Sequence, residues 1–264
     1  MRALRSGNAW QPIVGALVGV AWLTLAIWVQ SPYGRYLDHG GWTELGLAGS
    51  LCRALPGGPL MLSALLYVTG WLLMTIAMMV PTVTPLIAIF AHITQGRADR
   101  GILITLLILG YLSVWLAFGL VAHLTDMTLH SIVDRDAFLS ANGWIVGATV
   151  LGVAGAFQFS KLKYRCLDKC RTPFSFINEY WRGTAVRRQS YVLGVHHGLF
   201  CVGCCWAIML LMFLVGMGNV GWMLVIGSVM AIEKNATLGR WLSVPLGIGL
   251  LLTSIAVLAL NFRV

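Results

Sequence analysis

Seven long apolar runs dominate this chain of 264 residues and restrict the folds open to it. A helix needs about 20 apolar residues to cross a bilayer, whereas a barrel strand needs only about 10. Only 10% of the residues are charged and mean hydropathy is +0.82, whereas soluble domains carry about 25% charged residues. We therefore predict an all-α, polytopic transmembrane helical bundle that forms one domain over residues 1–264. The seven predicted spans are 13–29, 62–93, 102–124, 144–159, 191–215, 220–232 and 242–260.

The cations of the chain lie mostly between the predicted spans, and their distribution predicts the topology. Segments after an even number of spans are basic, and segments after an odd number are neutral or acidic. Lys and Arg accumulate in cytoplasmic loops, so the N-terminus is predicted in the cytoplasm of a multi-pass protein of the bacterial inner membrane. Because the cations cluster in one segment, we expect no nucleic-acid partner. That segment, 161–189, contains Lys161, Lys163, Arg165, Lys169, Arg171, Arg182, Arg187 and Arg188.

Two histidines and three cysteines stand at the start of the fifth predicted span: His196, His197, Cys201, Cys204 and Cys205. Imidazole and thiolate bind soft or borderline metals. His197, Cys201 and either later cysteine follow at steps of three or four, so they share one helix face. Ionisable groups at membrane depth are costly and often functional, which favours a metal site. The alternative is that the thiols are small apolar side chains that help helices to pack.

A second cysteine pair, Cys166 and Cys170, lies in the basic segment. Its i, i+4 spacing on a helix would suit a two-thiolate clip for a soft ion. The neighbouring Lys and Arg residues favour the thiolate form. The alternatives are an inert reduced pair in the cytosol or a redox pair.

Met78 and Met79 precede two prolines, Pro81 and Pro85, in the second predicted span. Proline inside a helix frees a carbonyl and kinks the axis. Thioethers beside such a kink would suit Cu(I), provided that this span packs against the fifth. The alternative is that the methionines fill gaps in the core.

Three further polar residues occur near span ends. Gln158 ends the fourth predicted span, where it is expected to bond a ligand or another helix. Glu233 and Lys234 follow the sixth predicted span, and we expect them to form a pair that snorkels to the interface.

Four stretches of the sequence, 77–82, 157–173, 194–206 and 219–234, resemble one bacterial family of predicted metal-binding integral membrane proteins. Some of its members resemble the membrane copper chaperone that accompanies bacterial tyrosinase. The most specific pieces are Gly-Cys-Cys-Trp at 203–206 and Cys-x-x-x-Cys-Arg-x-Pro at 166–173. The resemblance covers about residues 65–235, implies metal binding there and suggests copper. His196 stands where the family has a basic residue, so more weight rests on His197.

Together these observations predict a membrane-embedded protein that binds a soft metal, Cu(I) or else zinc, and delivers or inserts copper into a partner copper enzyme. No P-loop sequence is present, so a metallochaperone or a transporter-like protein is expected in preference to an enzyme. The expected partners are the lipid bilayer and a copper enzyme or other membrane subunits. One alternative is a metal-containing subunit of a membrane oxidase or monooxygenase, and another is a structural subunit whose cysteines only pack. The predicted metal ligands are His197, Cys201, Cys204, Cys205, Cys166, Cys170, Met78, Met79 and His196.

Overall fold

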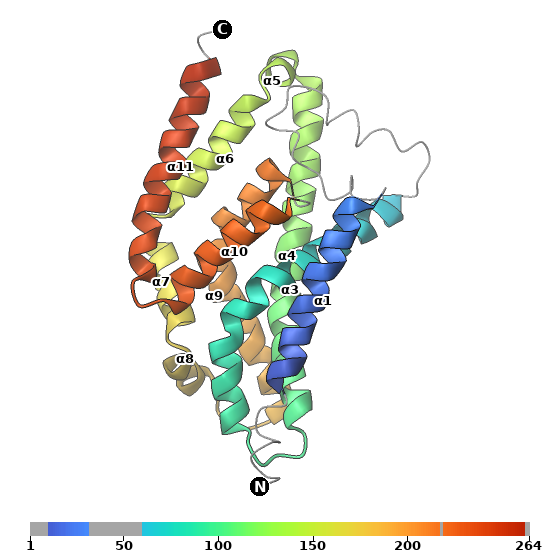
Figure 1. Cartoon of the computed structure of the whole chain (residues 1–264), viewed down its shortest axis with the longest axis vertical. Coiled ribbons are helices and arrows are strands. Elements are labelled where there is room, and N and C mark those ends of the chain that lie inside the picture. The colour runs from blue at the N-terminus through green and yellow to red at the C-terminus, as the bar shows by residue number, and fades with distance from the viewer. Residues whose placement is uncertain (1–9, 32–59, 217–218, 262–264) are drawn as a thin grey trace.

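The structure, a computed structural model, describes residues 10–31, 60–216 and 219–261. Within these ranges every regular element is a helix and there is no strand, which confirms the all-α prediction (Figure 1). The helices are α1 (Trp10–Gln30), α3 (Leu60–Ile93), α4 (Arg100–Arg135), α5 (Ala137–Ala141), α6 (Trp144–Phe157), α7 (Lys161–Arg171), α8 (Pro173–Tyr180), α9 (Val186–Val215), α10 (Val220–Asn235) and α11 (Gly239–Asn261).

Five of the described helices, α1, α3, α4, α9 and α11, are long and apolar enough to cross a membrane. Helices α6 and α7 meet at a bend of 63° and would make a sixth crossing if they form one broken span. Helix α10 has 16 residues and is therefore about 24 Å long, less than the roughly 30 Å of a bilayer's hydrocarbon core. The structure thus supports five or six spans, and the seventh remains a prediction.

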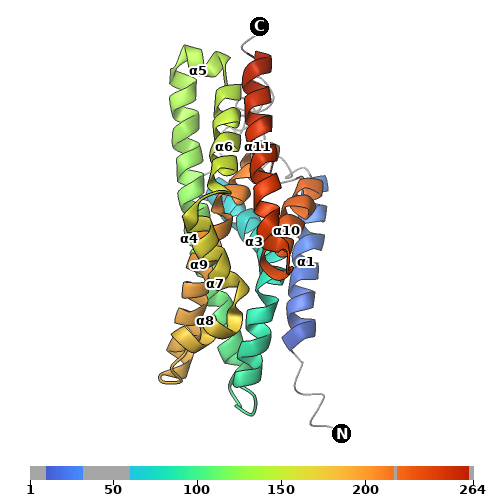
Figure 2. The same cartoon turned by 90° about the vertical axis from the view of Figure 1, so that its left-hand side faces the viewer.

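The basic segment 161–189, predicted as a loop, contains two helices, α7 and α8. The Ser160 side chain caps α7 by accepting a hydrogen bond from the Lys163 backbone, and Pro173 occupies the first turn of α8. Figures 1 and 2 show α8 and the turn between α3 and α4 at one end of the molecule, with α5 and the end of α11 at the other. The two basic segments after the second and fourth predicted spans therefore approach the same end of the molecule, and the predicted orientation in the membrane stays a prediction.

Helix α3 continues through both prolines, and each carbonyl that they leave without a helical donor has another partner. Pro81 frees the carbonyl of Ala77, which accepts a hydrogen bond from the Trp22 indole of α1 at 3.2 Å. Pro85 frees the carbonyl of Pro81, which accepts from the Thr84 hydroxyl at 2.9 Å. Because both freed carbonyls accept a hydrogen bond, α3 can bend as Figure 1 shows without leaving either carbonyl unpaired.

Helices α4 and α9 cross at glycines. A Cβ atom on Gly110 would overlap the carbonyl of Tyr191, and one on Gly194 would overlap the carbonyl of Leu107. A Cβ on Gly198 would lie 3.1 Å from the Tyr111 carbonyl. Small residues spaced by four allow such close backbone contact between membrane helices. The crossing sets the rotation of α9 about its own axis, and therefore also the direction in which Cys201, Cys204 and Cys205 of the same helix point.

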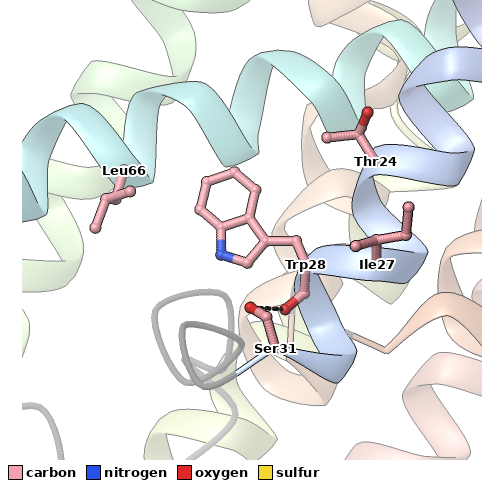
Figure 3. A pocket seen from close by; sticks show the side chains of 5 residues that line it. All are labelled: Thr24, Ile27, Trp28, Ser31 and Leu66. Atoms are coloured by element: carbon pink, nitrogen blue, oxygen red, sulfur yellow. Dashed lines mark hydrogen bonds between the residues drawn. The ribbon is translucent and has the colours of Figure 1, made fainter.

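Helices α1 and α3 leave an open apolar hollow of about 370 Å³ between them. Thr24, Ile27, Trp28, Ser31 and Leu66 line it, and Figure 3 shows the Trp28 ring projecting between the two helices. None of these side chains is a cysteine, histidine or methionine, so the hollow contains none of the predicted metal ligands.

Candidate metal centre

Helix α7 packs along α9, and this contact joins the two cysteine motifs of the sequence. The sulfur of Cys170 on α7 lies 3.9 Å from the sulfur of Cys204 on α9, although the residues are 34 positions apart. The sulfurs of Cys204 and Cys205 are 3.4 Å apart. Three of the predicted ligands therefore form a continuous row of sulfur atoms.

The spacing of these sulfurs suits a shared soft ion. At a metal–sulfur bond length of about 2.3 Å, two thiolates on one ion at angles of about 109–120° lie about 3.8–4.0 Å apart. The Cys170–Cys204 separation of 3.9 Å falls in this range. Across the described ranges, no three His, Cys, Asp or Glu side chains are already grouped as ligands of one ion. A third donor would therefore need a change of side-chain rotamer.

Cys201 lies at the other side of the cluster, fully buried between three helices. Its sulfur is 3.0 Å from the Tyr111 hydroxyl of α4 and 2.9 Å from the Lys234 ammonium of α10. Neither contact was predictable from the sequence, because helix spacing along α9 carries no information about α4 or α10. The available signal was a lysine two positions after the end of an apolar run, 220–232, that contains two methionines.

His197 is buried one turn before Cys201, and its Nδ1 atom has no hydrogen-bond partner among the residues that the structure describes. Its ring lies beside Tyr111 and Phe176, with centroids 6.0 and 5.2 Å away. An imidazole nitrogen without a donor or acceptor in an apolar surrounding is available to a metal. His196 points elsewhere and packs edge-on against Tyr180 at 4.8 Å, and its Nδ1 likewise has no partner in the described part of the chain.

Both predicted methionine ligands are buried on α3. The sulfur of Met79 is 3.8 Å from the Lys234 ammonium, which is itself 2.9 Å from the sulfur of Cys201. The two sulfurs are therefore at most about 6.7 Å apart, which fits a position beside the cluster. Met78 instead packs toward Gly227 of α10. A Cβ atom added to Gly227 would lie 3.5 Å from the Cγ of Met78.

Cys166 lies against the backbone of α9 at Gly203. A Cβ atom added to this glycine would be only 2.6 Å from the sulfur of Cys166. Cys166 makes no hydrogen bond to another thiol within the described ranges. Cys170 is half-buried, whereas the other described cysteines are buried. Of the two thiols on α7, Cys170 is therefore the one that is both accessible and in contact with the row of sulfurs.

Glu233 and Lys234 do not form the snorkelling pair that the sequence suggested, because both are buried and have separate partners. Glu233 is bound by the Lys163 ammonium at 2.7 Å and by the Ser243 hydroxyl at 2.6 Å. Lys163 also donates to Gln158, so Gln158 bonds another helix and not solvent. This group of side chains links α7, α10 and α11 to the end of α6, and so holds α7 in position.

The outer face of the basic segment carries exposed ion pairs. The Lys169 ammonium donates to Glu179 of α8, and this hydrogen bond lowers the pKa of the Glu179 carboxyl. Arg171 donates to backbone carbonyls of Glu233, Ala236 and Thr237. These contacts attach the turn between α10 and α11 to the end of α7 that carries Cys170.

Comparison with known proteins gives one match. The sequence model of a family described as a copper chaperone, PpoB2, matches residues 68–257, more than two thirds of the chain. The matched range contains all of the predicted metal ligands. The comparisons with curated proteins and with solved structures returned no match.

Proposed function

The chain belongs to the PpoB2 copper chaperone family, and from this premise we propose that it carries copper as Cu(I) on the sulfurs of α7 and α9 within the inner membrane. The single observation that carries the proposal is the meeting of Cys170 and Cys204 at 3.9 Å, across the contact between two helices. Soft thiolate ligands select Cu(I) among the first-row metals. Structural zinc takes four ligands in a closed tetrahedral arrangement, whereas the contact between α7 and α9 brings two sulfurs together. Zinc is therefore the less favoured ion.

The half-buried Cys170 is the receiving thiol in this proposal. Cu(I) taken up there needs only to exchange ligands with Cys204, then with Cys205, to reach the core. Cys201 and His197 complete the site at depth, because they lie on the same face of α9 and His197 has a nitrogen that no described residue hydrogen-bonds. Cys166, Met78, Met79 and His196 remain proposed auxiliary donors on the path.

Delivery to a copper enzyme follows from this arrangement of donors. Copper held by two or three donors can be passed on by ligand exchange, whereas a closed four-ligand site would retain it. We propose that the acceptor is a copper enzyme in or at the membrane. The family assignment supports this role over that of an oxidase or monooxygenase subunit, which would need imidazole-rich catalytic ligation.

The test is the copper content of variants purified anaerobically in detergent. Cys204→Ser and Cys205→Ser each remove a soft donor, and we expect copper retention and thiolate-to-copper ultraviolet absorption to fall steeply in each. His197→Ala should also lower retention, because it removes the donor one turn before Cys201. Ala207→Ser is the matched control, since it adds a buried hydroxyl to the same helix without removing a thiol.

The alternative that the cysteines only pack makes the opposite prediction. It requires the double variant Cys204→Ser/Cys205→Ser to lose some stability while retaining as much copper as the wild type. That result would exclude the cluster as the copper site. Thermal unfolding of each variant, recorded on the same preparation, distinguishes a lost ligand from a protein that has not folded.

A further inference from the structure

The ammonium group of Lys234 is buried next to sulfur atoms and not next to a carboxylate. It lies 2.9 Å from the sulfur of Cys201, 3.1 Å from the Thr82 hydroxyl and 3.8 Å from the sulfur of Met79. Its side chain belongs to a residue that is only 5% exposed. In the described part of the chain no carboxylate forms an ion pair with it. A positive charge is therefore fixed beside the proposed copper ligands.

The neighbouring carboxylate does not serve as the counter-charge of Lys234. Glu233 is already paired with Lys163, on the side of α10 that faces α7 and α11. A buried ammonium without a paired anion is costly. Thiolates of the cluster are the available anions, which makes Lys234 part of the charge balance of the site.

The charge balance differs between monovalent and divalent ions. A monovalent ion held by two thiolates leaves one negative charge, which the ammonium neutralises. A divalent ion on the same two thiolates leaves no negative charge, so the ammonium is buried without a counter-charge and is repelled by the metal. The same two thiolates, with the ammonium beside them, therefore bind a monovalent ion more favourably than a divalent one.

From this geometry we infer that Lys234 is a specificity-determining residue that makes the site favour monovalent over divalent soft cations. The inference rests on the proposed copper-carrying function and adds the charge of the cargo to it. A metal bonded to Cys201 at about 2.3 Å would lie no more than about 5 Å from the ammonium nitrogen. One additional positive charge at that distance weakens binding by about 10²-fold at an effective dielectric constant of about 20.

The experiment compares Cu(I) with Cd(II), which is also soft and binds thiolates but carries one more charge. The dissociation constants of both ions are measured anaerobically in detergent by competition with chromophoric chelators. Lys234→Met removes the charge with little change of volume, and Lys234→Gln removes it but keeps a polar donor near Thr82. In both variants we expect the preference for Cu(I) over Cd(II) to fall by about 10²-fold. Lys234→Arg, which restores the charge, should recover the wild-type preference.

Lys161→Met is the control, because Lys161 is an exposed lysine and its loss should leave the ratio unchanged. A ratio that stays at the wild-type value in Lys234→Met and Lys234→Gln would overturn the inference, as would an equal weakening of both ions. A variant that does not fold is replaced in the comparison by the other neutral substitution. If the wild-type protein binds neither ion, the proposed function itself fails, which is a different result from an unchanged ratio.

Discussion

Replacement of Lys163 by methionine should lower the free energy of unfolding by about 3–5 kcal/mol, the cost of breaking a buried ion pair by removing one partner. The side chains of Lys163 and Glu233 are 0% and 1% exposed, and their charged atoms are 2.7 Å apart. In Lys163→Met the Glu233 carboxylate keeps only the hydrogen bond from Ser243. Within 10–31, 60–216 and 219–261 its second oxygen already has no partner, so this part of the chain offers no spare donor to replace the ammonium.

Removal of both charges should be much less harmful than removal of one. In the double variant Lys163→Met/Glu233→Met no charge is left buried, and apolar side chains of similar length fill the space. Replacement of whole buried ion pairs by well-packed apolar residues is often neutral or stabilising. We therefore expect the double variant to be more stable than either single variant by about 2 kcal/mol or more.

The assay is denaturant unfolding in detergent, followed by tryptophan fluorescence, on the metal-free protein. Lys169→Met is the matched control, because it makes the same substitution on the same helix in an exposed pair with Glu179. Exposed pairs contribute little, so this variant should unfold like the wild type. The reasoning is refuted if Lys163→Met costs no more than the control, or if the losses of the two single variants add in the double variant.

Three further predictions concern the helices that carry the site. Trp22→Phe should cost about 1–3 kcal/mol of unfolding free energy, because it leaves a carbonyl freed by proline without a donor; an unchanged unfolding midpoint would contradict this. Gly194→Leu should abolish the folded protein, because a side chain there meets backbone of α4, whereas Gly249→Leu, with open space around it, should purify normally. A topology reporter fused after Arg182 should be active as a cytoplasmic fusion and one after Asp136 as an external fusion, and the reverse pattern would reject the predicted orientation.

The helices were predictable from the sequence because apolar length alone determines most of them. The run at 191–215 lies within α9, and the spacing of His197, Cys201 and Cys204 placed these residues correctly on one helix. The ends of the elements were less predictable. Helix α4 continues to Arg135, beyond its predicted end at residue 124, because polar residues at a span end do not themselves break a helix.

The contacts between helices could not be read from the sequence. Lys234 was expected to reach the interface, since a lysine after an apolar run usually does. The structure instead directs it toward Cys201, which depends on how α10 crosses α3 and α9. The contact of Cys170 with Cys204 likewise needs α7 to fold back along α9, where Cys166 lies against Gly203, while Lys163 and Glu233 pair α7 with α10.

The distribution of the cluster along the chain also determines when it comes into existence during synthesis. Cys170 leaves the ribosome 34 residues before Cys204, and Lys234 follows Cys201 by 33 residues. At about 5–20 residues per second, each interval lasts about 2–7 s. Copper that meets the nascent chain in the first interval finds the thiols of α7 before Cys204 and Cys205 have been made. Charge discrimination begins only when α10 has joined the bundle, so a chain that is interrupted before α10 would expose its sulfurs to any soft ion in the cell.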